Sequence, residues 1–451
     1  MSAWSGRRLH FVGIGGAGMS GLALVAKQLG AEVSGSDRVQ SSYSERLRTA
    51  GIAPAIGHDA ANVPEGGDVV VSTAIAESNP ELARARELGL RVLHRGDLLA
   101  EVTSLKRSIA VAGAHGKTTT TGMLAHVLRA TGRDPAFVMG GELREAGTNA
   151  AWGAGDWVVV EADESDRSFL KLTPDVAVVT NIELDHHTTY ASEAELIAAF
   201  EEFAANSGRV IAWQEARLAA GARRFGLDAG DLRAEAVELV PGGSRFRVVD
   251  AAASTSPAET DVVVELRVPG DHNVLNALAA LAAAEAAGVP VAEAAPTLRG
   301  FGGAGRRFEG RGLTASGACV FDDYAHHPTE IRATLAAAKT LGAERVIAVF
   351  QPHLYSRTQH LAKQFGDALS LADASVVVDI YPARERAEDF PGVTGYLIAA
   401  ATAKAAHGRP VWWIPSMDEA ADLLEEELGD GDVLLTLGAG DVDSLAAKLT
   451  S

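Results

Sequence analysis

The sequence predicts an α/β protein of three domains: an N-terminal Rossmann-like domain, a central P-loop ATPase domain and a C-terminal Rossmann-like domain. Apolar strands alternate with helical segments along the whole chain, which is typical of parallel sheets covered by helices. Glycine-rich turns follow strands in both the first and the second part of the chain. The length of 451 residues also fits about three domains, at roughly 150 residues per domain.

The composition limits the classes of protein to be considered. Hydrophobic residues make up 47% and charged residues 22%, which is the balance of a globular protein with a large core. The net charge of −19 argues against a nucleic-acid partner, since binding to phosphate backbones needs a basic face. The single cysteine, Cys319, excludes an internal disulfide and a cysteine-rich metal site.

The N-terminus superficially resembles a secretory signal, because Arg7 and Arg8 precede an uncharged stretch at residues 11–26. That stretch holds glycines at positions 13, 15, 16, 18 and 21, which suit a nucleotide-binding turn and not a membrane-inserting helix. No run of 18 or more apolar residues occurs elsewhere. We therefore expect a cytoplasmic protein that makes no contact with a membrane.

The predicted domains are residues 1–105, 106–308 and 309–451. Strands of the first domain are expected at residues 9–13, 32–36, 69–72 and 91–93. Strands of the second are expected at 109–112, 136–139, 157–161, 176–180 and 210–213, followed by a short antiparallel edge within 234–268 and an alanine-rich helix at 274–287. Glycine- and arginine-rich residues 300–312 are predicted to form a linker. Strands of the third are expected at 318–322, 346–350, 375–380, 411–414 and 433–437.

Residues 13–18 read GIGGAG and fit the pattern G-x-G-x-x-G between a strand and a helix. Glycines allow a tight turn there, so that a pyrophosphate can lie at the helix N-terminus. Asp37 ends the next strand, where an acidic residue would bind a ribose hydroxyl. The motif alone leaves open NAD, another pyrophosphate ligand, or a tight turn with no ligand.

Residues 113–119 read GAHGKTT and follow the apolar strand at 109–112. The backbone N–H groups of such a loop cradle phosphates, Lys117 reaches the β- and γ-phosphates, and Thr118 holds Mg²⁺. Val111 stands where the first glycine of the common pattern would fall. The combination of strand, glycines, Lys-Thr and helix predicts an ATP site.

Glu161 ends a strand beside this loop and begins the acidic run EADESD at 161–166. A carboxylate at this end of a strand is placed to hold Mg²⁺. A solvated acidic loop is the alternative interpretation for Glu164 and Asp166.

Histidines mark further candidate segments at residues 181–187, 270–276, 322–328 and 350–357. His and Asn at a helix start suit hydrogen bonds to a base or ribose, or simple helix capping. A zinc site is a weaker alternative, because no cysteine and no third ligand at metal spacing accompany the histidine pairs. The last two segments follow apolar strands, where ligands bind in open α/β sheets, although each one alone is equally explained as loop structure.

Taken in order, the motifs resemble those of the Mur ligase family. They are GIGGAGMSG at 13–21, GAHGKTTTT at 113–121, EADESD at 161–166, NIELDHH at 181–187, HNVLN at 272–276, DDYAHHPTE at 322–330 and PHLYSRT at 352–358. The resemblance covers essentially the whole chain. It implies the three-domain fold and an ATP-dependent ligase of peptidoglycan precursor synthesis, which joins L-alanine to the carboxylate of UDP-N-acetylmuramate through an acyl phosphate. A murein-peptide recycling ligase and, more remotely, an NAD-dependent oxidoreductase or a nucleotide-gated regulatory protein are the alternatives.

The resemblance also implies roles for individual residues. The ATP-binding residues are Gly113, Ala114, His115, Gly116, Lys117, Thr118, Thr119, His272, Asn273, Asn276 and Asp323. The UDP-substrate residues are Gly15, Gly16, Ala17, Gly18, Met19, Ser36, Asp37, Asn181 and His353. Tyr324, His326 and Arg357 would bind the amino acid, and Thr118, Glu161 and His186 would hold Mg²⁺. Lys117, Glu161, His186 and Arg307 would act in catalysis. Leu354 departs from the family, which often has arginine there, so that Arg357 carries more of the task of binding the carboxylate.

Overall fold

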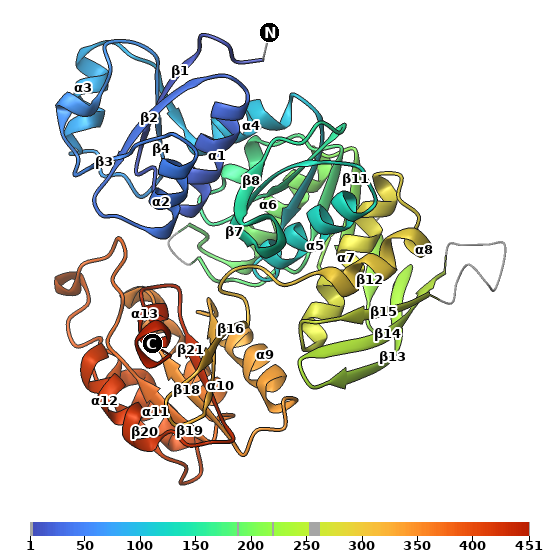
Figure 1. Cartoon of the computed structure of the whole chain (residues 1–451), viewed down its shortest axis with the longest axis vertical. Helices are drawn as coiled ribbons and strands as arrows, with labels where there is room; N and C mark the ends of the chain where they lie inside the picture. The colour runs from blue at the N-terminus through green and yellow to red at the C-terminus, as the bar shows by residue number, and fades with distance from the viewer. Residues whose placement is uncertain (1–2, 187–188, 219–220, 252–261, 451) are drawn as a thin grey trace. The chain divides into compact units, whose positions relative to one another are not determined.

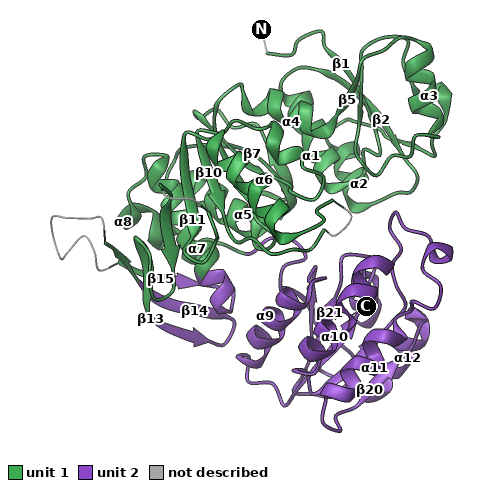
Figure 2. Cartoon of the chain, turned by 180° about the vertical axis from the view of Figure 1, so that it is seen from behind, with its two compact units in different colours: residues 1–235, 248–263, 275–302 green, residues 236–247, 264–274, 303–451 purple. Residues whose placement is uncertain are grey.

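The computed structural model describes residues 3–186, 189–218, 221–251 and 262–450, which form three separate β-sheets (Figure 1). Contacts divide the chain into two compact units, shown in Figure 2. The first unit comprises residues 1–235, 248–263 and 275–302, and the second comprises residues 236–247, 264–274 and 303–451. None of the described helices combines the length and apolar character needed to cross a membrane.

The N-terminal sheet has the strand order β3-β2-β1-β4-β5, and all of its pairs are parallel. Its strands are β1 (Arg8–Val12), β2 (Glu32–Asp37), β3 (Ala55–Ile56), β4 (Asp68–Val71) and β5 (Val92–His94). Its helices are α1 (Ala17–Gln28), α2 (Ser42–Thr49), α3 (Pro80–Glu87) and α4 (Arg95–Thr103). Strand order changes direction at β1, so ligands are expected beside the carboxyl end of this strand.

The central sheet has the order β15-β14-β13-β12-β11-β10-β6-β9-β7-β8. Its strands are β6 (Arg107–Ala112), β7 (Ala136–Leu143), β8 (Thr148–Ala151), β9 (Trp157–Glu161), β10 (Val176–Val179), β11 (Arg209–Trp213), β12 (Arg223–Gly226), β13 (Leu232–Val240), β14 (Gly243–Asp250) and β15 (Val262–Leu266). Its helices are α5 (Lys117–Ala130), α6 (Glu193–Ala205), α7 (Asp271–Ala286) and α8 (Val291–Ala294). The middle strands β6, β9 and β10 are apolar and almost wholly buried, as expected for parallel strands covered on both faces.

Helix α1 joins the first two sheets into one unit, because it packs against β7 and β8 of the central sheet. Gly21 makes this approach possible, since a Cβ there would lie 3.3 Å from the side chains of Val138 and Ala150. Leu22 and Val25 of α1 belong to the same buried cluster as Val138 and Ala150. A single apolar core therefore runs beneath both the glycine loop and the central sheet.

The C-terminal sheet has the order β16-β17-β21-β18-β19-β20. Its strands are β16 (Glu309–Leu313), β17 (Cys319–Asp323), β18 (Arg345–Phe350), β19 (Ala374–Val377), β20 (Val411–Trp413) and β21 (Asp432–Leu437). Its helices are α9 (Pro328–Lys339), α10 (Tyr355–Leu369), α11 (Tyr396–Ala405), α12 (Met417–Glu427) and α13 (Asp443–Leu449). Among the described strand pairs of this sheet, β16–β17 is antiparallel and the others are parallel. Separate buried clusters contain alternate residues of β18, as expected for a sheet with a core on each face.

Three predicted elements are corrected by the structure. Helix α7 begins at Asp271, three residues before the predicted start, so His272 and Asn273 lie in its first turn. The predicted linker at 300–312 contains most of β16, because pairing with β17 satisfies the backbone of a glycine-rich edge segment. The strand predicted at 375–380 ends at Val377. Part of the predicted edge segment within 234–268, residues 252–261, lies outside the described residues.

Candidate active site

The predicted pyrophosphate turn lies between β1 and α1. Gly13 has a φ of 79°, a conformation that residues with side chains rarely adopt. The Gly15 amide donates a hydrogen bond to Asp37 Oδ2 at 2.8 Å, and a Cβ at Gly15 would lie 2.9 Å from the same oxygen. No side chain caps α1 after Gly16, which leaves the positive end of the helix suited to an anion. The turn therefore has the form that the sequence predicted, with one Asp37 oxygen used to hold it.

Two other residues predicted at this site, Ser36 and Met19, are buried. The Ser36 hydroxyl donates to Glu81 Oε2 at 2.7 Å and lies 3.0 Å from His58 Nδ1. Its side chain therefore fixes the end of β2 from inside the domain and is not a surface group. Sequence reasoning did not single out Glu81, whose position after Asn79 and Pro80 indicated only the start of a helix.

Glu81 is a fully buried carboxylate at the centre of a polar network. Its hydrogen-bonding neighbours include His10 Nε2 (3.0 Å), Ser36 Oγ (2.7 Å), His58 Nδ1 (3.3 Å), the Asp59 amide (3.2 Å) and Asn62 Nδ2 (2.9 Å). Burial acts to raise the pKa of Glu81, but hydrogen bonds from His10, Asn62 and Ser36 outweigh it and lower the pKa to about 2. The network ties β1, β2 and α3 together beneath the carboxyl end of the sheet.

Replacing Glu81 by glutamine is expected to cost on the order of 3 kcal/mol of stability at neutral pH, which corresponds to a pKa lowered from 4.5 to about 2 on folding. Because the folded pKa is the lower one, this stabilisation is present above pH 4.5 and is lost as the pH falls towards 2. Urea unfolding of the wild type and the variant across that range measures both effects. Glu77→Gln is the control, since Glu77 is 81% exposed and pairs only at the surface with Arg86. If Glu81→Gln and the wild type lost stability equally on acidification, the pH-dependent stability could not be attributed to the Glu81 carboxylate.

The predicted phosphate loop, residues 113–119, lies between β6 and α5. Gly113 and Gly116 have φ angles of 136° and 81°, and α5 begins after Gly116 without a side-chain cap. A Cβ at Gly113 would collide with the Thr180 side chain, and one at Gly116 would collide with that of Asn276. Both positions therefore require glycine, because of their positive φ angles and because a side chain would not fit. The loop leaves the N-terminus of α5 open to a phosphate.

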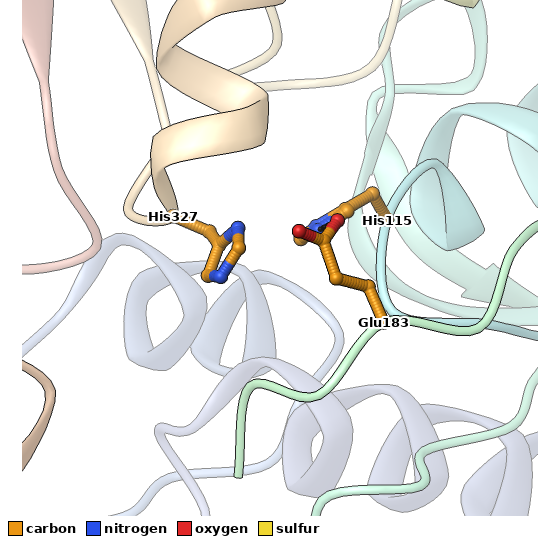
Figure 3. A group of neighbouring side chains, drawn as sticks. All are labelled: His115, Glu183 and His327. Carbon is orange, nitrogen blue, oxygen red and sulfur yellow. Dashed lines mark hydrogen bonds and ion pairs between the residues drawn. The ribbon is translucent and has the colours of Figure 1, made fainter. Parts of the chain in front are cut away.

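Asn181 and Glu183 support this loop from the segment after β10. The Asn181 side chain accepts a hydrogen bond from the His115 amide and donates one to the His115 carbonyl, both at 2.9 Å. His115 Nε2 lies 3.0 Å from Glu183 Oε2, and Figure 3 shows these two side chains facing each other. Asn181, which is predicted at the UDP substrate, thus lies against the phosphate loop.

The Lys117 ammonium lies within the loop and contacts Glu164. Its Nζ donates to the Gly113 carbonyl at 2.6 Å and the Ala114 carbonyl at 3.2 Å, and lies 2.9 Å from Glu164 Oε2. Burial acts to lower the pKa of Lys117, but the charges of Glu164 and Asp163 outweigh it and raise the pKa to about 12. Glu164 is only 2% exposed, so the solvated-loop interpretation is wrong for this residue.

Two of the three proposed metal ligands, Thr118 and Glu161, meet beside the phosphate loop. Thr118 Oγ1 lies 3.0 Å from both oxygens of Glu161, whose Oε2 also accepts from the Gly140 amide at 2.7 Å. His186 Nε2 lies 3.5 Å from Glu164 Oε1. A hydroxyl and carboxylate oxygens beside a phosphate loop are the donors that Mg²⁺ prefers, so the residues present fit this ion. His187, the second histidine of that motif, lies outside the described residues.

The predicted nucleoside residues lie on α7. Asn276 Oδ1 accepts from Thr120 Oγ1 at 3.2 Å, which connects α7 to the phosphate-loop helix. Asn273 Nδ2 donates to the Pro269 carbonyl at 2.8 Å and lies 3.1 Å from His272 Nε2. Burial lowers the pKa of His272 to about 4, so its imidazole is neutral at neutral pH.

In the C-terminal domain, Asp323 ends β17 and is held by backbone amides. Its carboxylate accepts from Phe308 N at 2.7 Å and Ala325 N at 2.8 Å, while burial raises the pKa of Asp323 to about 6. The Arg307 guanidinium lies 5.2 Å from the centre of the Tyr324 ring. Asp323 thus orders the segment that carries Arg307 and Tyr324.

A second group of predicted residues lies after β18. His353 stacks on Tyr381 with ring centres 5.8 Å apart, and its Nδ1 lies 3.2 Å from Arg357 Nη1. His326 is a further neighbour, with its ring centre 6.0 Å from that of His353. Leu354 has a φ of 74°, which is strained for a residue with a side chain and turns the chain into α10. The C-terminal residues predicted from separate motifs are therefore brought together.

The chain is similar to known proteins along nearly its whole length. Family models match residues 8–107 (Mur ligase family, catalytic domain), residues 111–284 (Mur ligase middle domain) and residues 306–440 (Mur ligase, glutamate ligase domain). Among curated proteins, the UDP-N-acetylmuramate–L-alanine ligase of Acidithiobacillus ferrooxidans is 47% identical and covers 98% of this chain and 97% of its own. That of Streptomyces coelicolor is 46% identical and covers 98% and 96%.

Solved structures give the same result. The UDP-N-acetylmuramate–alanine ligase of Thermotoga maritima superposes with a TM-score of 0.84 at 31% identity and covers 98% of both chains. A murein peptide ligase from Psychrobacter arcticus has a TM-score of 0.74 at 27% identity and also covers 98% of both. The predicted three-domain α/β architecture is confirmed, while the exact domain limits remain a prediction. The chain belongs to the Mur ligase family.

Proposed function

We propose that this chain joins L-alanine to the carboxylate of UDP-N-acetylmuramate, with hydrolysis of ATP to ADP and phosphate. The observation that carries the proposal is similarity at 44–47% identity, over 98% of the chain, to proteins named for this reaction. The phosphate loop with a half-buried, charged Lys117 supplies the cation that an ATP-dependent ligase needs at the phosphoryl group. The reaction takes place in the cytoplasm, as an early step of peptidoglycan precursor synthesis.

The reaction divides into phosphoryl transfer and amide formation. The γ-phosphoryl group of ATP is transferred to the muramoyl carboxylate, the alanine amine attacks the acyl phosphate, and phosphate leaves. Lys117 donates to the phosphoryl oxygens as charge develops on them. Residues 113–119 bind the phosphates of ATP, and Asn276, Asn273 and His272 lie at the nucleoside.

Thr118, Glu161 and His186 are proposed to hold Mg²⁺, since they combine the hydroxyl, carboxylate and imidazole donors described above. When bound, the ion offsets negative charge on the phosphates and the muramoyl carboxylate. Glu161 is kept in place by the Gly140 amide, and Glu164 holds the Lys117 ammonium beside the same group. Hydrogen bonds and ion pairs within the chain thus hold these side chains in place before the substrates bind.

The remaining assignments concern the two other substrates. The UDP pyrophosphate is proposed to bind at the turn formed by Gly15, Gly16, Ala17, Gly18 and Met19. Ser36 and Asp37 are proposed to lie near the nucleoside, and His353 to contact the muramoyl end. Tyr324, His326 and Arg357 bind alanine, and Arg307 contacts the ATP phosphates. A murein-peptide ligase is the second candidate, because a solved structure of that class also covers 98% of the chain.

Amino-acid selection separates the two candidates. With ATP, Mg²⁺ and UDP-N-acetylmuramate, L-alanine is expected to give the highest turnover. Glycine and L-serine are expected to fall roughly 10–200-fold in kcat/KM, because one methylene or hydroxyl changes transition-state binding by only about 1–3 kcal/mol. L-Glutamate and L-lysine are expected to give no product. ADP release measures all of these rates, and preference for an alanine-containing tripeptide over free L-alanine would assign the chain to the recycling ligases.

A further inference from the structure

The start of α4 in the N-terminal domain lies directly against the acidic segment that follows β9. A Cβ at Gly96 would lie 2.7 Å from Ser168 Cβ, so only glycine allows this approach. Lys171 pairs with Asp97 at 2.6 Å across the same boundary, at its exposed side. The boundary therefore joins the domain that carries the glycine loop to the segment beside the phosphate loop.

Arg95 is a half-buried cation at this boundary. Its side chain is 17% exposed, and its Nη2 donates to Asp163 Oδ2 at 2.7 Å and to Asp166 Oδ2 at 2.9 Å. Each aspartate uses its other oxygen within the segment, where Asp163 Oδ1 accepts from Ser165 N and Asp166 Oδ1 accepts from Ser168 N, both at 3.0 Å. Arg95 therefore fixes the two carboxylates that shape this turn.

The same turn positions the groups that act on ATP. Glu164 lies between the two aspartates in sequence, and its carbonyl accepts a hydrogen bond from the buried Tyr190 hydroxyl at 2.8 Å. Its carboxylate contacts Lys117 at 2.9 Å and His186 at 3.5 Å. A change in how Arg95 holds the turn would therefore move the partner of Lys117.

The other end of the guanidinium faces the glycine loop. Arg95 Nη1 lies 3.8 Å from the position that a Cβ would take at Gly18, in the first turn of α1. A pyrophosphate at this helix N-terminus would lie within reach of that nitrogen, and a planar guanidinium can serve two anionic partners from its separate nitrogens. The Arg95 side chain therefore lies between the first turn of α1 and the turn that carries Glu164.

We propose that Arg95 is a positioning residue that couples the two sites: Nη1 senses the UDP pyrophosphate at the glycine loop while Nη2 holds the turn that places Glu164 against Lys117. This inference rests on the proposed function, because it takes the glycine loop as the UDP-substrate site. It predicts that occupancy of the glycine loop raises the affinity of the phosphate loop for nucleotide, and by linkage the reverse.

The test measures that coupling by calorimetry with UDP-N-acetylmuramate and a magnesium complex of a non-hydrolysable ATP analogue. Each ligand is titrated alone and with the other at saturation. The wild type is expected to show at least about fivefold mutual tightening, within the usual range of such coupling. Arg95→Ala is expected to bring the coupling to within about twofold of none, with weaker binding of UDP-N-acetylmuramate alone.

Arg95→Lys keeps the result interpretable if the alanine variant unfolds. A lysine ammonium still pairs with Asp163 and Asp166 but has no second nitrogen to reach Gly18, so the fold is kept and the coupling is lost. Lys171→Ala is the matched control, since it breaks an ion pair of the same boundary away from the turn at Glu164 and is expected to keep the wild-type coupling.

Coupling retained in Arg95→Lys, or lost equally in Lys171→Ala, would overturn the proposal. Binding of both ligands to the wild type without coupling would also overturn it and leave the proposed function standing. A wild-type protein that does not bind UDP-N-acetylmuramate would overturn the proposed function, and this inference with it.

Discussion

Replacing Lys117 by alanine is expected to abolish ligation and to leave the binding of UDP-N-acetylmuramate nearly intact. The ammonium is the cation of the phosphate loop, and it is held there by Glu164 and two loop carbonyls. Loss of one donor to the transition state commonly costs on the order of 10²–10³ in rate, and a charged donor to a phosphoryl group is expected to cost at least as much. The turn proposed to bind the UDP pyrophosphate lies between β1 and α1 of the first sheet and does not include Lys117.

The measurements are initial rates of ADP release and calorimetric titration with each nucleotide substrate. Removing Lys117 leaves Glu164 buried without its cation, so Lys117→Met with Glu164→Gln is a second variant that keeps the packing and removes both charges. Lys171→Ala, at a 40% exposed lysine, is the control for loss of a positive charge. Near-normal turnover in the Lys117 variants would contradict the assignment of Lys117 to the ATP phosphates. Loss of UDP-N-acetylmuramate binding while ATP binding is preserved would contradict it as well.

Much of the fold could be predicted because its strands are buried on both faces. The strands β6, β9, β10 and β18 each contain at least four consecutive apolar residues, and such runs are easily recognised as strands of a parallel sheet. Short edge strands such as β3 and β16 have no such signal, since β3 has two residues and β16 holds two glycines. Their pairing depends on neighbours that are distant in sequence.

The same limit applies to the candidate site. The glycine loops could be predicted because their chemistry depends on consecutive residues, at 13–18 and at 113–119. Glu164 was indistinguishable from a solvated acid, because the Lys117 that makes its burial favourable is 47 positions away in sequence. Arg95 and Glu81 were missed for the same reason, since their partners lie on other strands and helices and no local pattern marks a charge that will be buried.

Replacing Glu161 is expected to have the second large effect on the rate of ligation, because this carboxylate is proposed to hold both Thr118 and the metal. Glu161→Gln keeps the shape of the side chain and an oxygen for the Gly140 amide, but removes the charge that would bind Mg²⁺. The expected result is a fall in kcat on the order of 10²-fold or more and a higher Mg²⁺ concentration for half-maximal rate, with unchanged affinity for UDP-N-acetylmuramate. Rates measured against Mg²⁺ at saturating ATP test this expectation.

Asp156→Asn is the matched control, since Asp156 is an exposed acid just before the other end of the same strand. Its replacement is expected to leave kcat and the Mg²⁺ concentration for half-maximal rate unchanged. A Glu161→Gln enzyme with the wild-type dependence on Mg²⁺ would show that the ion rests on other residues, and the buried Glu164 carboxylate beside His186 would then be the first to test.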